Sequence, residues 1–201
     1  MIYPKSLSDL IESFKMLPGI GEKTAERLAF AVLGFDEENV YEFSNNLLKI
    51  KENLKHCSIC GTLTDDNICN VCNDKTRFKD VLIVVEDSKD VFLFEKIGNF
   101  RGYYHVLGGL ISPLNDVGPD DIAIEGLLNR IKNNEIQEVI LAIKSGIEAD
   151  TTSLYIKKIL EKNNIVVTRI ASGIPIGADM DYVDTLTLES ALKNRKEVLT
   201  D

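Results

Sequence analysis

The sequence predicts a multidomain protein of the α+β and α/β classes. We expect a helical N-terminal domain, a four-cysteine zinc module, an α/β domain with a mostly parallel sheet, and a helical C-terminal tail. Apolar residues recur at helical spacing near the N-terminus, all four cysteines fall within one short stretch, and strand and helix patterns alternate in the second part. These observations place the expected domains at 1–55, 56–73, 79–173 and 174–201.

The composition is that of a soluble globular protein with a sizeable core. The chain has 201 residues, of which 44% are hydrophobic and 27% are charged. Its longest aliphatic run, "VLIVV" at 81–85, is too short to cross a bilayer, and the opening "MIYPKSLSDL" lacks a secretory signal. We therefore expect a cytoplasmic protein with no membrane partner. The net charge of −9 argues against a broad basic surface, so any contact with nucleic acid must be local.

Residues 7–33 predict two helices around a tight turn. Apolar side chains follow helical spacing on both sides of the turn, at Leu7, Leu10, Ile11, Phe14, Leu17, Ala25, Leu28, Ala29 and Val32. A Pro-Gly step ends the first helix, and Gly19 and Gly21 let a partner approach the backbone closely. Free amides at the start of the second helix can hold a phosphate oxygen, and Lys23 and Arg27 share one face of that helix.

The segment "LPGIGEKTAERLAF" resembles the helix–hairpin–helix DNA-binding motif. The resemblance implies that the hairpin amides at Gly19 and Gly21, together with Lys23 and Arg27, grip the phosphate backbone without reading sequence. The alternative is an ordinary corner between two helices with a solvated Lys and Arg. Two glutamates on the second helix dilute its positive charge.

A third helix is expected over about 37–55. Its apolar residues alternate at intervals of three and four, at Val40, Phe43, Leu47, Ile50 and Leu54. This seam fits either packing into a core or a face for self-association, and the sequence leaves both interpretations open.

The four cysteines form two C-x-x-C knuckles, Cys57 with Cys60 and Cys69 with Cys72. Each knuckle turns two sulfurs toward one point, and together they complete the tetrahedral S4 shell that suits Zn²⁺. Between the knuckles, "GTLTDDNI" has the polar turn residues of a short hairpin. So small a module cannot bury enough apolar surface to fold alone, so the metal would hold it together. Four thiolates leave no open coordination position, which favours a structural zinc over a catalytic one.

From residue 79 onward, strands alternate with helices, which predicts an α/β domain with a largely parallel sheet. Strands are expected at 80–86, 103–109, 138–143 and 165–171, and helices at 88–98, 120–134 and 151–164. Ligand sites in such sheets lie at the carboxyl ends of the strands. Glu86 falls at one of these ends, and the loop 144–150, with Glu148 and Asp150, falls at another.

The motif "VVE" ending at Glu86, followed by this strand order, resembles the Toprim domain of topoisomerases and primases. In active members, a strand-end Glu acts as general acid or base and a later Asp-x-Asp holds Mg²⁺. Here Lys144 and Ser145 stand where the first Asp is expected, and Glu148 and Asp150 are displaced. We therefore favour a Toprim fold without catalysis, and the sequence leaves open whether Glu148 and Asp150 bind Mg²⁺.

The order of the segments, with "YYHVLGGLISPLNDVGPDDI" and "VTRIASGIPIGADMDYVDTLTLESALKNR", closely resembles the RecR family of bacterial recombination mediators. The resemblance implies a protein that is not an enzyme and that works with RecO and RecF to load RecA onto gapped DNA. It also implies a ring of two or four subunits that clamps single- or double-stranded DNA. Where the family usually shows Asn-Pro-Thr followed by Glu-Gly-Glu, this chain has "KSGIEAD" at 144–150.

The same resemblance assigns roles to individual acids. It implies that Glu86 and Glu148 contact a protein partner, RecO in particular for Glu86. It places Asp179, Asp181 and Asp184 in a Walker-B-like tail segment near a subunit interface. The chain has no GxxxxGK[ST] loop, so we do not infer ATP hydrolysis.

Two other hypotheses stay open on the sequence. One is a Mg²⁺-dependent DNA phosphotransferase of the Toprim type, which cleavage of DNA in the presence of Mg²⁺ would reveal. The other is an adaptor that binds only proteins, which unchanged DNA binding after replacement of Lys23 and Arg27 would favour.

Overall fold

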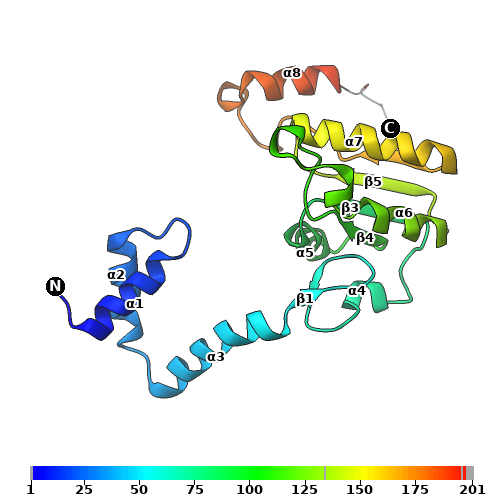
Figure 1. The fold of residues 1–201 in the computed structure, drawn as a ribbon. Coiled ribbons are helices and arrows are strands. Elements are labelled where there is room, and N and C mark those ends of the chain that lie inside the picture. Colours follow the sequence, from blue (N-terminus) through cyan, green and yellow to red (C-terminus); the bar gives the residue numbers. More distant parts are fainter. Residues whose placement is uncertain (1, 134, 196, 198–201) are drawn as a thin grey trace. The chain divides into compact units, whose positions relative to one another are not determined.

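A computed structural model describes residues 2–133, 135–195 and 197. The chain divides into two compact units, Met1–Leu54 and Lys55–Asp201 (Figure 1). Within the described residues, no helix combines the length and apolar character that a bilayer span requires.

The first unit consists of α1 (Lys5–Lys15), α2 (Glu22–Val32) and α3 (Glu37–Asn53). The first two helices pack against each other around a small core, with Ile11, Ala25 and Ala29 buried and Tyr3, Leu7, Leu10, Phe14 and Ile20 partly buried. Two alanines at the crossing let the helix backbones approach closely, because little side-chain volume separates them.

Helix α3 begins at an N-cap residue, but none of its own residues is buried. Asp36 caps it by accepting a hydrogen bond from the Asn39 amide at 2.9 Å. No residue of the helix is buried, and the seam residues Val40, Phe43, Leu47, Ile50 and Leu54 are all exposed. Among the described residues of the first unit, this apolar seam therefore packs into no core.

The zinc module opens the second unit with β1 (Lys55–His56), β2 (Leu63–Thr64) and α4 (Asn70–Asn73). The expected hairpin between the knuckles differs in the structure, because β2 pairs antiparallel with β1, which precedes the first knuckle. Gly61 adopts φ 78° and donates its amide to the Cys57 carbonyl oxygen at 2.9 Å. This left-handed turn closes the first knuckle and sends the chain back beside β1.

The sheet is fully parallel, as the alternating pattern predicts. Its strands are β3 (Val81–Val85), β4 (Tyr103–Val106), β5 (Glu138–Ala142) and β6 (Val166–Arg169). They lie in the order β4-β3-β5-β6. The central strand β3 is an almost continuous buried aliphatic run, which is typical of a parallel strand covered on both faces.

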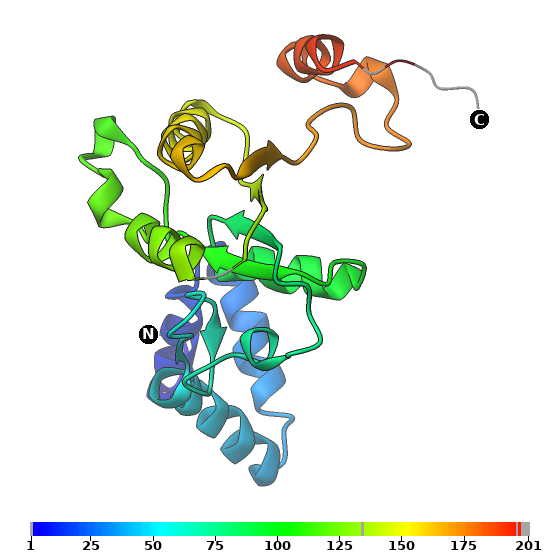
Figure 2. The same ribbon diagram turned by 90° about the vertical axis from the view of Figure 1, so that its right-hand side faces the viewer.

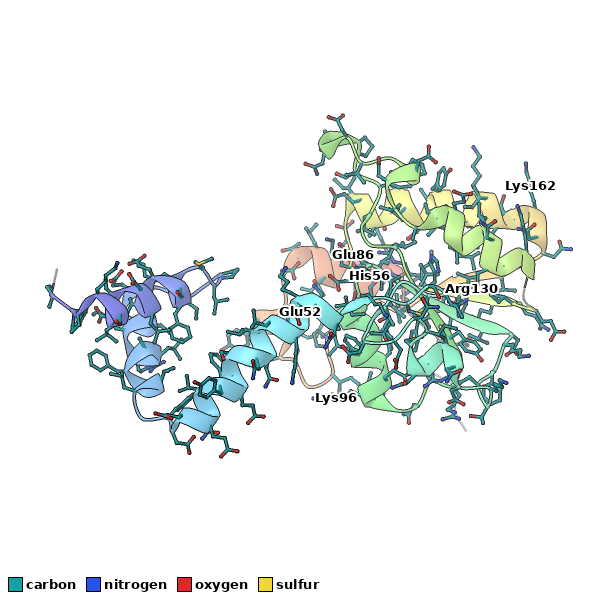
Figure 3. The ribbon with its side chains drawn as sticks, turned by 60° about the horizontal axis from the view of Figure 1, so that its bottom comes forward. Glu52, His56, Glu86, Lys96, Arg130 and Lys162 are labelled. Carbon is teal, nitrogen blue, oxygen red and sulfur yellow. The ribbon has the colours of Figure 1, made fainter. Side chains whose placement is uncertain are left out.

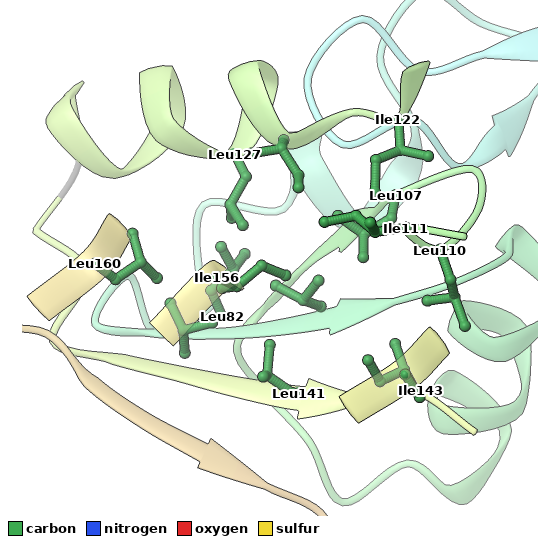
Figure 4. Close-up of a cluster of buried hydrophobic side chains, with 14 of the residues drawn as sticks. Leu82, Leu107, Leu110, Ile111, Ile122, Leu127, Leu141, Ile143, Ile156 and Leu160 are labelled. Atoms are coloured by element: carbon green, nitrogen blue, oxygen red, sulfur yellow. The ribbon is translucent and has the colours of Figure 1, made fainter. Parts of the chain in front are cut away.

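Helices cover the two faces of the sheet. On one face, α6 (Ile124–Asn133) and α7 (Ile147–Leu160) enclose the larger core cluster, which includes Leu82, Leu127, Leu141, Ile156 and Leu160 (Figure 4). On the other face, α5 (Ser88–Ile97) packs over a second cluster that includes Ile83, Val85, Val91 and Tyr104. Short 3₁₀ helices complete the connections: η1 (Pro113–Asn115), η2 (Pro119–Asp121), η3 (Glu161–Asn163) and η4 (Met180–Tyr182).

Two helices begin elsewhere than the sequence predicts. Helix α7 starts at Ile147, so Glu148 and Asp150 lie in its first turn rather than in a loop. Gly146, at φ 150°, precedes the helix, and carboxylates in a first turn interact favourably with the helix dipole. Helix α6 starts at Ile124, because the preceding residues tighten into η2 instead.

The C-terminal tail follows β6 through an irregular segment to α8 (Thr185–Lys193) (Figure 2). The hydroxyl oxygens of Ser172 and Ser190 lie 3.3 Å apart, which links the start of this segment to α8. Of the predicted tail 174–201, residues 196 and 198–201 lie outside the described residues.

Candidate functional site

The turn between α1 and α2 exposes backbone amides. Gly19 takes a left-handed conformation at φ 80°, and Gly21 caps α2 without a side-chain hydrogen bond. The Ala25 amide donates to the Gly21 carbonyl at 2.9 Å, so the earlier amides of α2 have no carbonyl of their own helix to bind. Gly21 has an ordinary φ of −87°, and a Cβ there would meet no atom within 4 Å. Glycine is a favoured N-cap residue, and the open space beside it leaves room for a ligand at the amides.

The two predicted cations on α2 are exposed. Among the described residues, neither Lys23 nor Arg27 forms an ion pair. Glu22 is neutralised by Lys15, whose Nζ lies 2.7 Å from its carboxylate and 2.9 Å from that of Glu12. The hydrogen bond to Glu22 raises the pKa of Lys15. The hairpin therefore combines open amides with two cations that no described acid neutralises, which is the chemistry that a phosphate diester requires.

The four cysteine sulfurs converge on one point. They all lie within 4.8 Å of one another, and the sulfurs of Cys60 and Cys69 are 3.6 Å apart. A tetrahedral ZnS4 centre with bonds of about 2.3 Å separates its sulfurs by about 3.8 Å. The Cys69 amide donates to the Cys57 sulfur at 3.3 Å, and the Cys72 amide to the Cys69 sulfur at 3.4 Å. The residues fit a zinc ion, whose coordination sphere four thiolates would fill.

The zinc module covers one edge of the parallel sheet. The Val106 amide, at the end of the edge strand β4, donates to the Cys60 carbonyl at 2.8 Å. The Leu63 amide donates to the Ser88 hydroxyl oxygen at 3.1 Å, which ties β2 to the start of α5. An open strand edge is prone to pair with other chains, so the module protects β4 as well as joining the sheet.

Glu86 lies at the carboxyl edge of the sheet, directly after β3. Its carboxylate pairs with Lys144, which follows β5, with Nζ and Oε1 3.0 Å apart. The hydrogen bond from this ammonium to Glu86 raises the pKa of Lys144. An internal cation therefore stands where a divalent metal would have to bind Glu86.

The displaced acids each have their own partners. Glu148 accepts hydrogen bonds from the Ser112 hydroxyl at 2.5 Å and from the side-chain amide nitrogen Nδ2 of Asn115 at 3.4 Å. Asp150 pairs with Arg169 at 2.5 Å. In the described part of the chain, the cysteines form the only group of three or more potential ligands close enough to hold a metal. The described acids at this edge therefore form no group of three converging carboxylates, although Mg²⁺ can bind through only one or two carboxylates together with phosphates.

Two of the three predicted tail acids are helix caps. Asp179 precedes η4 and accepts from the Asp181 amide at 3.3 Å. Asp184 precedes α8 and accepts from the Thr187 hydroxyl at 2.7 Å and amide at 2.9 Å. The hydroxyl bond lowers the pKa of Asp184. Local capping thus accounts for two of the three acids.

Family models match the chain in four consecutive segments: the RecR helix-hairpin-helix at 7–51, the RecR zinc finger with four cysteine ligands at 54–74, the Toprim domain at 80–171, and the RecR C-terminal segment at 173–196. The "Recombination protein RecR" of Streptococcus equi subsp. equi is 50% identical over 198 residues, which is 98% of this chain and all of the relative. The chain belongs to the RecR family.

Other RecR proteins are similar to this chain over its whole length. That of Streptococcus mutans is 49% identical over 199 residues, and that of Streptococcus thermophilus is 49% identical over 198 residues. In both, the match covers 98% of this chain and 100% of the relative. The predicted resemblance and fold class are confirmed, and the match to a zinc-finger model with four cysteine ligands agrees with the sulfur geometry.

The sequence of this RecR family member carries one signal that sequence reasoning missed, the pair between Glu86 and Lys144. Strands β3 and β5 are neighbours in register, with Val85 opposite Ala142. The residues that follow two paired parallel strands emerge side by side, and Lys144 comes two residues after Ala142. A long cation at that offset can reach a carboxylate one residue beyond the neighbouring strand.

Proposed function

We propose that this protein is a recombination mediator that binds DNA without reading its sequence and catalyses no reaction. The exposed turn before α2 is the observation that carries the proposal. The open amides after Gly21 can bind phosphate oxygens, while Lys23 and Arg27 supply positive charge on the same helix. Contacts of this kind hold the backbone and leave the bases unread.

The protein acts in this proposal as a ring clamp of two or four subunits. A net charge of −9 leaves each subunit with only a local positive patch. A ring repeats this patch, and repeated weak contacts on one polymer raise the apparent affinity far above that of a single patch. The exposed apolar seam of α3 is a surface that such an assembly would bury.

Protein partners complete the proposed activity. We infer that it acts in the cytoplasm with RecO and RecF to help load RecA onto gapped DNA, as the family resemblance implies. Glu86 and Glu148 are the proposed partner contacts. Both side chains are half-buried and bonded within the chain, Glu86 to Lys144 and Glu148 to Ser112. The zinc ion supplies structural bracing through the four cysteines and no chemistry.

Replacement of both hairpin cations tests the proposal. We expect Lys23→Ala/Arg27→Ala to weaken binding to gapped DNA by about 10- to 100-fold near 0.1 M salt. The slope of log affinity against log salt should fall by about 1.8, since two phosphates are no longer neutralised. Lys5→Ala/Lys89→Ala removes the same charge at exposed positions elsewhere and should bind as the wild type does. Equal binding by both double variants would favour the protein-only adaptor.

Assembly and catalysis are measured separately. Light scattering of the full chain, with and without DNA, should give the mass of a dimer or tetramer, and a strict monomer in both conditions would contradict the clamp. Incubation of DNA with the protein and Mg²⁺ should leave the DNA intact. Nicking that Glu86→Gln abolishes would establish the phosphotransferase instead.

A further inference from the structure

In the second unit, the charged residues are distributed differently at the two edges of the parallel sheet. Each helix of a parallel sheet runs opposite to the strands, so its C-terminal end lies at the edge where the strands begin. Figure 4 shows this arrangement, with Leu160 and the end of α6 beside the starts of the strands. The last turns of α6 and α7 carry Arg130, Lys132, Lys157 and Lys158, and Lys162 follows directly in η3. This amino edge therefore gathers cations although the unit is acidic overall.

At the opposite, carboxyl edge of the sheet, two cations form ion pairs with acids of the same chain. There, Lys144 pairs with Glu86 at 3.0 Å and Arg169 pairs with Asp150 at 2.5 Å. At the amino edge, Lys132, Lys157, Lys158 and Lys162 are all exposed, and none of them forms an ion pair with any described residue. Two arginines near the amino edge, Arg77 and Arg101, also pair within the chain, with Glu95 and Asp74. The contrast with the carboxyl edge therefore holds for the lysines at the ends of α6 and α7, which form no ion pair with a described residue.

The amino edge is also a fixed surface. The Gln137 amide donates to the Asp80 carbonyl at 2.7 Å, and the Val166 amide to the Gln137 carbonyl at 2.9 Å, so three strand starts lie side by side. Arg130 donates to the Tyr104 carbonyl oxygen, and its guanidinium carbon lies 5.5 Å from the Tyr103 ring centre. Figure 3 shows Arg130 and Lys162 on one side of this unit, away from Glu86.

We propose that this amino edge is a second nucleic-acid contact surface, on which Lys132, Lys157, Lys158 and Lys162 bind backbone phosphates. The inference rests on the proposed function, because it assumes a chain that holds DNA. Helix dipoles account for one favourable cation at each helix C-terminus. They do not account for three lysines around the end of α7, none of which pairs with Glu161 or with any other described acid.

The chemistry of the edge favours nucleic acid over an acidic protein. Protein interfaces are depleted in lysine at their buried centres, because its flexible stem and strongly hydrated ammonium are costly to order and desolvate. A phosphate backbone can be bound by spaced, hydrated positive charges, and the counterions that it releases favour this binding. The acids that share this edge limit its affinity and make it an auxiliary contact; they are Asp80, Glu135, Glu138 and Glu161.

The test compares three variants of the full chain on gapped DNA across a range of salt. The edge variant Lys132→Gln/Lys158→Gln/Lys162→Gln should bind at least about tenfold more weakly near 0.1 M salt. Its salt slope should fall by about 0.9 for each duplex phosphate that the variant no longer neutralises. The control Lys5→Gln/Lys89→Gln/Lys193→Gln removes equal charge at exposed positions elsewhere and should keep the wild-type slope. Circular dichroism and zinc content verify that each variant is folded.

The outcomes separate this inference from the proposed function. If the edge variant matches its control while Lys23→Ala/Arg27→Ala loses binding, the second surface is wrong and the hairpin site stands. If only the edge variant loses binding, the hairpin proposal fails and this one stands. Polyglutamate serves as a competitor, and displacement of DNA by polyglutamate at equal charge concentration would overturn the inference in favour of an acidic protein partner.

Discussion

The two units of this chain are each stabilised internally, but their contacts join residues at different separations in the sequence. Helices α1 and α2 are consecutive, and three of the described residues are buried in the core that they share. The sheet unit joins strands far apart in the sequence, encloses two buried clusters, and adds a cysteine cluster at its β4 edge. Local packing leaves the hairpin backbone open to an outside ligand, whereas contacts between distant parts of the sequence build the core of the sheet unit.

Zinc removal should produce the largest effect and should confine it to the second unit. Structural zinc binds with apparent free energies of about 10–16 kcal/mol in small peptides, so its loss should unfold the module. The bond between the Val106 amide and the Cys60 carbonyl would break as well, exposing the β4 edge. Hydrogen exchange after treatment with a chelator should show faster exchange at 55–74 and 103–106.

The helical hairpin supplies the internal control for that experiment. Its core contains no residue of the zinc module, so amides of α1 and α2 should keep their protection after chelation. Equal loss of protection in both units would contradict the division between local and long-range stability. A Cys57→Ser variant should reproduce the effect without chelator, because three thiolates cannot complete the sulfur shell.

A buried ion pair provides the next largest effect. The side chain of Arg77 is only 8% exposed and bonds to both carboxylate oxygens of Glu95, at 2.9 and 2.5 Å, while the Tyr104 hydroxyl donates to the same carboxylate. We expect Arg77→Met to lower the free energy of unfolding by about 3 kcal/mol, since it strands a partly buried carboxylate. Urea denaturation measures the change.

Arg101 is the matched control for Arg77. Its side chain is 50% exposed and lies 3.9 Å from Asp74. Arg101→Met should cost less than about 1 kcal/mol, because solvent screens such a pair. Similar costs for the two variants would show that the Arg77 network gives no special support to the sheet unit.

The contrast between local and long-range contacts also explains which parts of the fold and the site could be predicted from the sequence. Three signals are short-range: the two C-x-x-C knuckles that begin at Cys57 and end at Cys72, the hairpin glycines, and the strand pattern. Each of these signals predicts its own element directly. The Arg77–Glu95 and Glu86–Lys144 pairs join residues 18 and 58 positions apart, so they follow only once strand order and register are known. Helix α7 starts earlier than predicted, because the local pattern around Gly146 is typical of a loop.

Acid should destabilise the sheet unit through His105. Burial lowers the pKa of His105 to about 4, while its ring nitrogen Nε2 lies 2.7 Å from the Ala123 carbonyl oxygen. The unfolded side chain titrates near 6.5, so the unfolded state binds the proton first as pH falls. Stability present above pH 6.5 should therefore decline toward pH 4, by about 2–3 kcal/mol at pH 4.5.

A His105→Gln variant isolates this contribution. Glutamine can still donate to Ala123 but does not titrate, so the difference in unfolding free energy between variant and wild type should change over this pH range. Denaturation at a series of pH values, with the two proteins side by side, cancels the shared effect of acid on the thiolates. A difference that stays constant from pH 7 to 4.5 would refute the role of His105.

The smallest stability effect comes from the hairpin and gives the sharpest test of its open backbone. Gly21→Ala meets no atom within 4 Å at an ordinary φ, but alanine is a poorer N-cap residue than glycine, so the change should lower the unfolding free energy by about 0.5–1 kcal/mol. Gly19→Ala places a side chain at φ 80° and should cost about 1–2 kcal/mol. If phosphate lies against the amides, Gly21→Ala should still weaken DNA binding, because its methyl group occupies that space. Thermal unfolding and DNA titration of both variants measure the two effects, and unchanged binding by a stable Gly21→Ala protein would show that the turn does not touch DNA.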